Sequence, residues 1–158
     1  MAKKERRYWD SDCFLNFLEK AEGNYEMCQA IIDLAEKGEI EIVTSALTLA
    51  EVLYLKPHKK VPPADAKKIS EFFKQDYILI VELDRVIAED AQKLFWNHSA
   101  LDPKDAVHVA TAIKVHADTL DTFDGNLRKL TGQMGSPPLS IGKPDKPQQN
   151  LKFAENEE

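Results

Sequence analysis

Four acidic residues lie at positions where a folded chain could bring their side chains together. Asp10 and Asp124 each follow a predicted strand, Asp105 lies at the start of a predicted helix, and Glu51 lies in the helix that follows the second predicted strand. Clustered carboxylates repel one another unless a divalent cation lies between them. These four positions are therefore consistent with an enzyme whose acids surround a cation.

Three of these acids also have simple structural interpretations, which the sequence leaves open. Asp10 is suited to cap the helix that follows it. Asp105 belongs to Asp102-Pro103-Lys104-Asp105, which is a favourable helix entry with a cap, a proline and an acid three residues after the cap. Asp124, followed by Gly125-Asn126, is typical of a turn or of a short helix cap.

Glu51 is harder to explain as a structural residue. It lies within residues 46–55, where eight of the ten residues are apolar. A helix that is apolar on all sides is usually buried, and a buried carboxylate requires a partner. The partner is either a metal ion or a Lys or Arg side chain. The histidines lack a paired spacing and are expected to be structural or surface residues: His58, His98, His108 and His116.

The elements that position these acids alternate between strands and helices. Apolar periodicity and capping residues, among them Asn24, Ser45 and Asp84, predict strands at 6–10, 39–44, 77–81 and 118–122 and helices at 13–21, 25–37, 46–55, 62–73, 85–96 and 102–116. The apolar run at 77–81 predicts a strand buried on both faces. Residues 139–141 could add an edge strand. This alternation predicts a three-layer α/β/α sandwich around a mostly parallel sheet, with a ligand crevice at the carboxyl ends of its strands.

Length and composition predict one compact domain over residues 1–132, followed by an irregular segment and acidic tail at 133–158. The net charge of −6 argues against a protein whose whole surface binds nucleic acid. Two cysteines without metal-like surroundings, and no signal peptide or long apolar run, favour the cytoplasm and no membrane partner.

The motifs around the four acids resemble those of the PIN-domain ribonucleases, which include VapC-like toxins of toxin–antitoxin pairs. They are Asp10-Ser11-Asp12, Thr44-Ser45 with Ala50-Glu51-Val52, the segment 105–112 (DAVHVATA) and the segment 120–124 (LDTFD). The resemblance covers about residues 6–130 and implies that Asp10, Glu51, Asp105 and Asp124 are catalytic metal ligands. It further implies an endoribonuclease that hydrolyses RNA phosphodiesters with Mg²⁺ or Mn²⁺, a homodimer and an antitoxin partner.

Supporting roles follow from the same resemblance, with two departures. Ser11 and Thr122 are small hydroxyl residues suited to orient water or phosphate, and Asp12 occupies a place often held by Asn or Ser. Asp121 stands where the family pattern is usually apolar, so either Asp121 or Asp124 could be the fourth acid.

Basic residues near the acids are candidates for phosphate contacts, although a solvated surface explains them equally well. They are Lys56, Lys59, Lys60, Arg128 and Lys129.

Two other functions fit parts of the pattern. Asp10-Ser11-Asp12 also matches the nucleophile motif of haloacid-dehalogenase-type phosphatases, but Phe14 stands where that family has Thr or Val. A PIN-like fold can also serve as a non-catalytic binding module. The chain contains no phosphate-binding glycine-rich motif.

Overall fold

The protein is described by a computed structural model that covers residues 4–54 and 60–145. Its centre is a sheet in the order β3-β2-β1-β4-β5, in which every neighbouring pair is parallel. The strands are β1 (Glu5–Trp9), β2 (Ile40–Ser45), β3 (Ile78–Val81), β4 (Thr119–Asp121) and β5 (Ser140–Gly142). The helices are α1 (Ser11–Leu18), α2 (Asn24–Glu36), α3 (Ala46–Glu51), α4 (Pro63–Phe72), α5 (Arg85–Asn97), α6 (Pro103–Lys114) and α7 (Gly125–Arg128).

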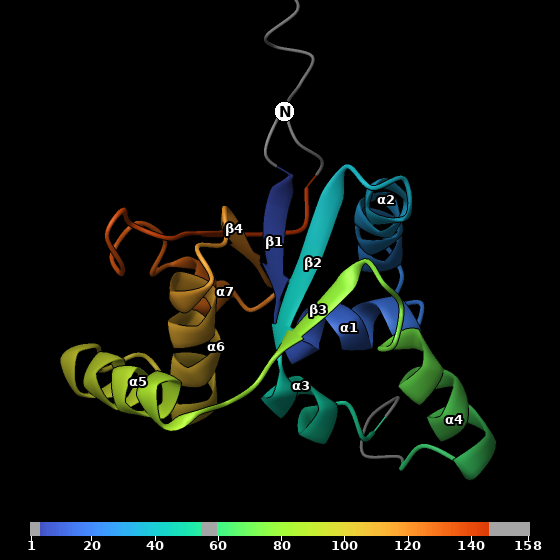
Figure 1. The fold of residues 1–158 in the computed structure, drawn as a ribbon, viewed down its shortest axis with the longest axis horizontal. Helices are drawn as coiled ribbons and strands as arrows, with labels where there is room; N and C mark the ends of the chain where they lie inside the picture. The colour runs from blue at the N-terminus through green and yellow to red at the C-terminus, as the bar shows by residue number, and fades with distance from the viewer. Residues whose placement is uncertain (1–3, 55–59, 146–158) are drawn as a thin grey trace, which may run out of the picture.

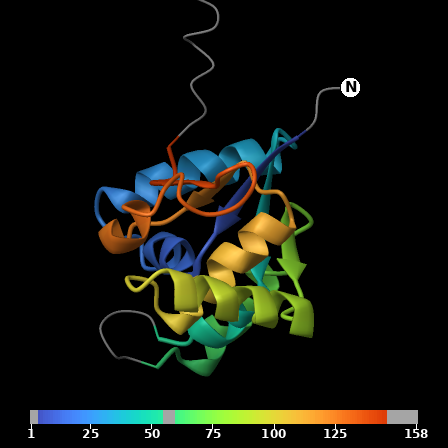
Figure 2. The same ribbon diagram turned by 90° about the vertical axis from the view of Figure 1, so that its left-hand side faces the viewer.

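Helices cover both faces of this sheet, as predicted (Figure 1). Helices α1, α2 and α4 lie on one side, and α5, α6 and α7 lie on the other. Figure 2 looks onto α5 and α6 with the sheet behind them. Each face has its own apolar core, because successive strand residues point to opposite sides. Tyr8 packs with the α5–α6 core, whereas Trp9 packs with the α1–α2 core.

The strand order places the predicted ligand crevice at the carboxyl ends of β1 and β4. The chain runs from central β1 to β2 on one side and later returns to β4 on the other side. In parallel α/β sheets, ligands bind beyond the carboxyl ends of the strands at such a switch in direction. Asp10 follows β1 and Thr122 follows β4, so both lie at this point.

A buried ion pair explains why the first strand is unusually polar. The Arg7 guanidinium donates to both Asp121 carboxylate oxygens, at 3.0 and 2.9 Å, and both side chains are buried. The Trp9 indole donates to the same carboxylate at 2.9 Å, and the Thr119 hydroxyl donates at 3.1 Å. A buried carboxylate is tolerated when a cation and hydrogen bonds satisfy it. These contacts give Asp121 a structural role.

Most element predictions are confirmed, including the edge strand predicted at 139–141, which overlaps β5 at residues 140 and 141. Met134, Leu139 and Ile141 are buried in the same core as α6. The boundary proposed after residue 132 remains a prediction.

Three local predictions are wrong. The strand predicted to be buried on both faces is the edge strand β3, in which Leu79 is 42% exposed. Gly23, with a positive φ of 82°, takes the N-cap position before α2, and Asn24 is already helical. The helix predicted for 46–55 ends at Glu51, and its Leu49 side chain is 43% exposed. Leu49 borders an open apolar groove of about 520 Å³ between α3 and α4, so an apolar sequence here does not mean burial.

No helix in the described ranges is both long and apolar enough to cross a membrane.

Candidate active site

Asp10 directly follows β1 at the predicted crevice. It is 4% exposed and caps α1 by accepting a hydrogen bond from the Cys13 amide at 3.1 Å, so its predicted capping role is real. Burial raises the pKa of Asp10 to about 7, and the negative charge of Asp12 adds to this effect, while a hydrogen bond from Thr122 and the proximity of His108 oppose it. A carboxyl group that is held so unfavourably when ionised would gain from a nearby cation.

The segment after β4 brings a second set of groups to the same place. The Thr122 hydroxyl accepts from the Asp124 amide at 3.1 Å, and Asp124 caps α7 by accepting from the Asn126 amide at 2.9 Å. Asp12 accepts from the Phe123 amide at 3.1 Å and so joins the start of α1 to this segment. Burial raises the pKa of Asp12, and the charge of Asp124 raises it further.

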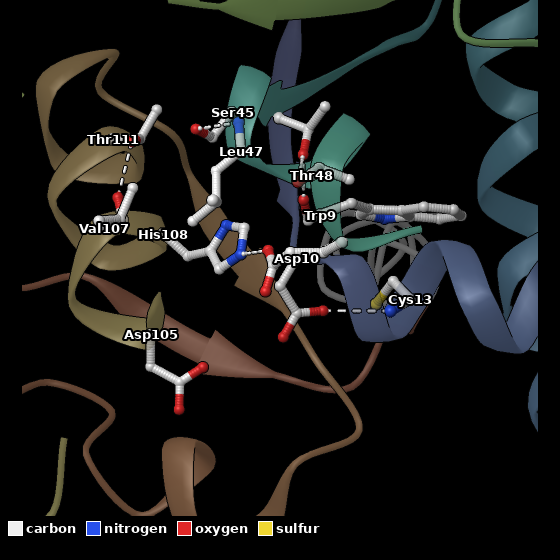
Figure 3. Close-up of polar contacts among 12 residues, drawn as sticks. Trp9, Asp10, Cys13, Ser45, Leu47, Thr48, Asp105, Val107, His108 and Thr111 are labelled. Atoms are coloured by element: carbon white, nitrogen blue, oxygen red, sulfur yellow. Dashed lines mark hydrogen bonds and ion pairs between the residues drawn. The ribbon is translucent and has the colours of Figure 1, made fainter. Parts of the chain in front are cut away.

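Asp105 enters from the first turn of α6. The cap of this helix is Asp102, whose Oδ1 accepts from the Asp105 amide at 2.8 Å, so the Asp105 carboxylate is not needed for capping. Burial raises the pKa of Asp105 to about 6, and the neighbouring charges of Asp102 and Asp124 contribute. Figure 3 shows the side chains of Asp10 and Asp105 beside the His108 imidazole.

Glu51 pairs with a histidine. Its Oε1 lies 2.6 Å from His108 Nε2, and their side chains are 13% and 2% exposed. The sequence analysis expected a metal ion, a Lys or an Arg as the partner of Glu51 and did not consider a histidine. It assigned His108 a structural or surface role and so did not predict the contact of His108 with Glu51. The available signal was spacing, because residues three apart on a helix share a face, and His108 follows Asp105 by three.

The site is not arranged as a closed metal centre. Among residues 4–54 and 60–145, no group of three or more His, Cys, Asp or Glu side chains is placed so that it could hold a metal ion. Asp10, Asp105 and Asp124 nevertheless share this edge of the sheet. His108, which is hydrogen-bonded to Glu51, lies close enough to Asp10 and Asp105 to affect the pKa of each. Ser11 is half-buried at the start of α1.

The basic candidates divide between two places. Arg128 and Lys129 follow Asp124 at the end of α7, where Lys129 is exposed. Lys60 is exposed beside the groove between α3 and α4. Lys56 and Lys59, like His58, lie outside the described residues. Contacts between these cations and a nucleic acid remain predictions.

Three solved structures have a similar fold. The Mycobacterium tuberculosis toxin VapC20, described as cleaving the sarcin-ricin loop, aligns with a TM-score of 0.62 and 14% identity over 77% of this chain and 92% of that chain. The Rickettsia felis VapBC2 structure, bound to a promoter DNA fragment, aligns at 0.59 and 18% over 86% and 96%. A toxin–antitoxin complex from Klebsiella pneumoniae aligns at 0.55 and 19% over 89% and 99%.

At these identities the three structures show a shared fold. No curated protein sequence matches this chain. The sequence model of the PIN domain, however, matches residues 7–133, which contain all four predicted acids. The chain belongs to the PIN-domain family.

Proposed function

We propose that this protein is a metal-dependent endoribonuclease that acts as the toxin of a toxin–antitoxin pair. The observation that carries the proposal is that Asp10, directly after β1, and Asp105, in the first turn of α6, both lie close to His108 and both have raised pKa values. PIN-family membership and the fold shared with an RNA-cleaving toxin support it. Family membership also replaces the phosphatase interpretation of Asp10-Ser11-Asp12.

The donor set suits Mg²⁺ or Mn²⁺, because it consists of hard carboxylate oxygens without thiolates. Asp10, Glu51, Asp105 and Asp124 are the residues that would hold the ion. Since no three of these side chains stand ready to share an ion, they would have to draw together around it. When bound, such an ion supplies charge neutralisation and an activated water for phosphodiester hydrolysis.

The remaining groups hold the acids and the substrate in place. Thr122 hydrogen-bonds Asp10, and its hydroxyl also fixes the backbone that carries Asp124. Asp12 fixes the next peptide through the Phe123 amide. The side chains of Arg128 and Lys129 would contact phosphates on the Asp124 side of the crevice, where an acidic site needs compensating positive charge.

The proposed partners are suggested by the similar structures described above. One similar structure is a toxin–antitoxin complex, and we propose an antitoxin for this chain as well. We also propose a homodimer, which sedimentation or light scattering on the purified full chain would check. A small neighbouring gene that encodes a DNA-binding protein would support the antitoxin.

The decisive experiment is cleavage of a mixed RNA substrate with Mg²⁺, with Mn²⁺ and with EDTA. We expect cleavage with metal, none with EDTA, and none by Asp10→Asn. The matched control is Asp84→Asn, which changes an exposed aspartate that caps α5 just as Asp10 caps α1. If the folded wild-type protein does not bind metal and does not cleave RNA, the result would favour a non-catalytic PIN-like module. If the protein releases phosphate from a monoester in a metal-dependent way but does not cleave RNA, the result would favour the phosphatase.

A further inference from the structure

His108 lies at the centre of a buried chain of polar contacts that joins three elements. The Tyr8 hydroxyl, on β1, lies 2.7 Å from Nδ1 of His108 on α6. The other ring nitrogen, Nε2, lies 2.6 Å from Glu51 Oε1 at the end of α3. Tyr8 is fully buried, and its ring meets the imidazole edge-on at a centroid distance of 5.8 Å.

The direction of the His108–Glu51 hydrogen bond follows from its acceptor, because an ionised carboxylate has no proton to donate. Burial raises the pKa of Tyr8, so its phenol keeps its proton and can donate to Nδ1. A neutral imidazole that accepts at Nδ1 carries its hydrogen on Nε2. Nε2 therefore donates to the Glu51 carboxylate, which holds one of its oxygens and leaves Oε2 without a bond to His108.

Glu51 needs such support more than the other three acids do. Asp10 and Asp124 cap helices through backbone amides, and Asp105 lies in the first turn of α6. Glu51 is instead the last residue of the six-residue helix α3, and the backbone leaves helical geometry at Val52. A carboxylate at a helix C-terminus is disfavoured by the helix dipole, and a glutamate side chain loses considerable rotational freedom when it is fixed.

We propose that His108 is a positioning residue that holds the Glu51 carboxylate in the crevice with Asp10 and Asp105. Helix α6 then supplies the site twice, directly through Asp105 and indirectly through His108. The inference rests on the proposed function insofar as Glu51 is a metal ligand. It adds a residue that the four-acid pattern does not include.

Substitutions at His108 separate positioning from simple packing. His108→Leu removes both ring nitrogens, whereas His108→Gln keeps an N–H donor near the place of Nε2. The matched control is Val109→Ala, which removes fully buried volume from the next residue of α6 without touching Glu51. Mn²⁺ binding is measured by calorimetry without RNA, and the melting temperature of each variant is measured alongside.

We expect His108→Leu to weaken Mn²⁺ binding by about 10–100-fold, as loss of a partner behind a metal ligand typically does. His108→Gln should restore part of this loss. Val109→Ala should melt earlier and bind Mn²⁺ as wild type does. Equal Mn²⁺ affinity of wild type, His108→Leu and His108→Gln would overturn the proposal, and so would a loss that Val109→Ala reproduces.

A double-mutant cycle with Glu51→Gln tests whether His108 acts through Glu51. If it does, His108→Leu adds little further loss of Mn²⁺ affinity once Glu51 is an amide. If the fold-losses of Mn²⁺ affinity in His108→Leu and Glu51→Gln simply multiply in the double variant, the proposal is overturned. If His108→Leu fails to fold, the cycle is run with His108→Gln.

Activity is measured separately, so that the two proposals can fail separately. Wild type that cleaves RNA while His108 variants bind Mn²⁺ normally leaves the ribonuclease proposal standing and removes the positioning role. If the wild type binds Mn²⁺ in a His108-dependent way but cleaves no RNA, the positioning role of His108 stands and the ribonuclease proposal fails. Absence of any Mn²⁺ binding by wild type would overturn both.

Discussion

Replacing Asp10 by Asn should stabilise the metal-free protein, and by more at high pH than at low pH. The native pKa of Asp10 is raised from 3.8 to about 7, so the folded state holds its proton more tightly than the unfolded state. The stability that this protonated group contributes is fully present below pH 4 and is lost as the pH rises toward 7. Asn does not titrate, and its side-chain oxygen can still accept from the Cys13 amide.

The magnitude follows from the pKa shift of this almost fully buried group. At about 1.36 kcal/mol per pKa unit, the ionised Asp10 destabilises the native state by up to about 4 kcal/mol at pH 8. At pH 5, which is about 1.2 units above the ordinary value, the same effect is about 1.6 kcal/mol. The advantage of Asp10→Asn should therefore grow by about 2–3 kcal/mol between these pH values, or roughly 5–12 °C in melting temperature.

The assay is thermal or urea unfolding in EDTA at several pH values from 5 to 8. Comparing the mutant–wild-type difference across pH removes any pH-independent effect of the amide on packing. Asp84→Asn, at an exposed cap, should show a small difference that does not change with pH. A mutant–wild-type gap that is flat or that shrinks as the pH rises would refute the raised pKa of Asp10.

Three other predictions concern the metal, the α6 entry and the buried ion pair. Mg²⁺ or Mn²⁺ should raise the melting temperature, and more at pH 8 than at pH 5, because metal binding requires carboxylates without their protons; superimposable melts with and without metal would contradict this. Asp105→Asn should abolish RNA cleavage with little loss of stability. Asp102→Asn, which keeps a capping oxygen, should still cleave RNA. Full activity of Asp105→Asn would return that residue to a structural role. Arg7→Met should lower the free energy of unfolding by about 3–5 kcal/mol in urea titrations, because it leaves Asp121 buried without its cation, and a loss below about 1 kcal/mol would contradict the pairing.

The sequence predicts the elements well where the signal is local. Ser45, Asp84 and Asp102 each cap the helix that the sequence assigns to them, because capping requires only a side-chain oxygen and a nearby amide. The position of β3 in the sheet is not local. An apolar run does not reveal which strands flank it, so the exposure of Leu79 could not be predicted.

For the candidate site, the sequence indicates the acids but not their contacts. Asp10, Asp105 and Asp124 lie at the same edge of the sheet, because parallel strand ends and helix starts meet there. The partner of Glu51 comes from a helix 57 residues later in the chain, and a search for paired histidines does not detect a histidine that binds a carboxylate. The contact of Asp121 with Arg7, 114 residues earlier, could not be read from the sequence either, because it depends on how β1 and β4 pair.

The Arg7–Asp121 pair also makes the interior around β1 depend on a part of the chain that is synthesised much later. Strand β1 pairs with β4 in a register that places Trp9 beside Asp121, so one edge of the central strand stays unpaired until residues 119–121 have been made. A nascent chain that stops before residue 121 would lack the buried carboxylate of Asp121, and Glu5 alone would pair with the Arg7 guanidinium. Pairing over such a separation forms late, and Asp124 lies beyond it. Incomplete chains should therefore lack both the closed sheet and the assembled crevice.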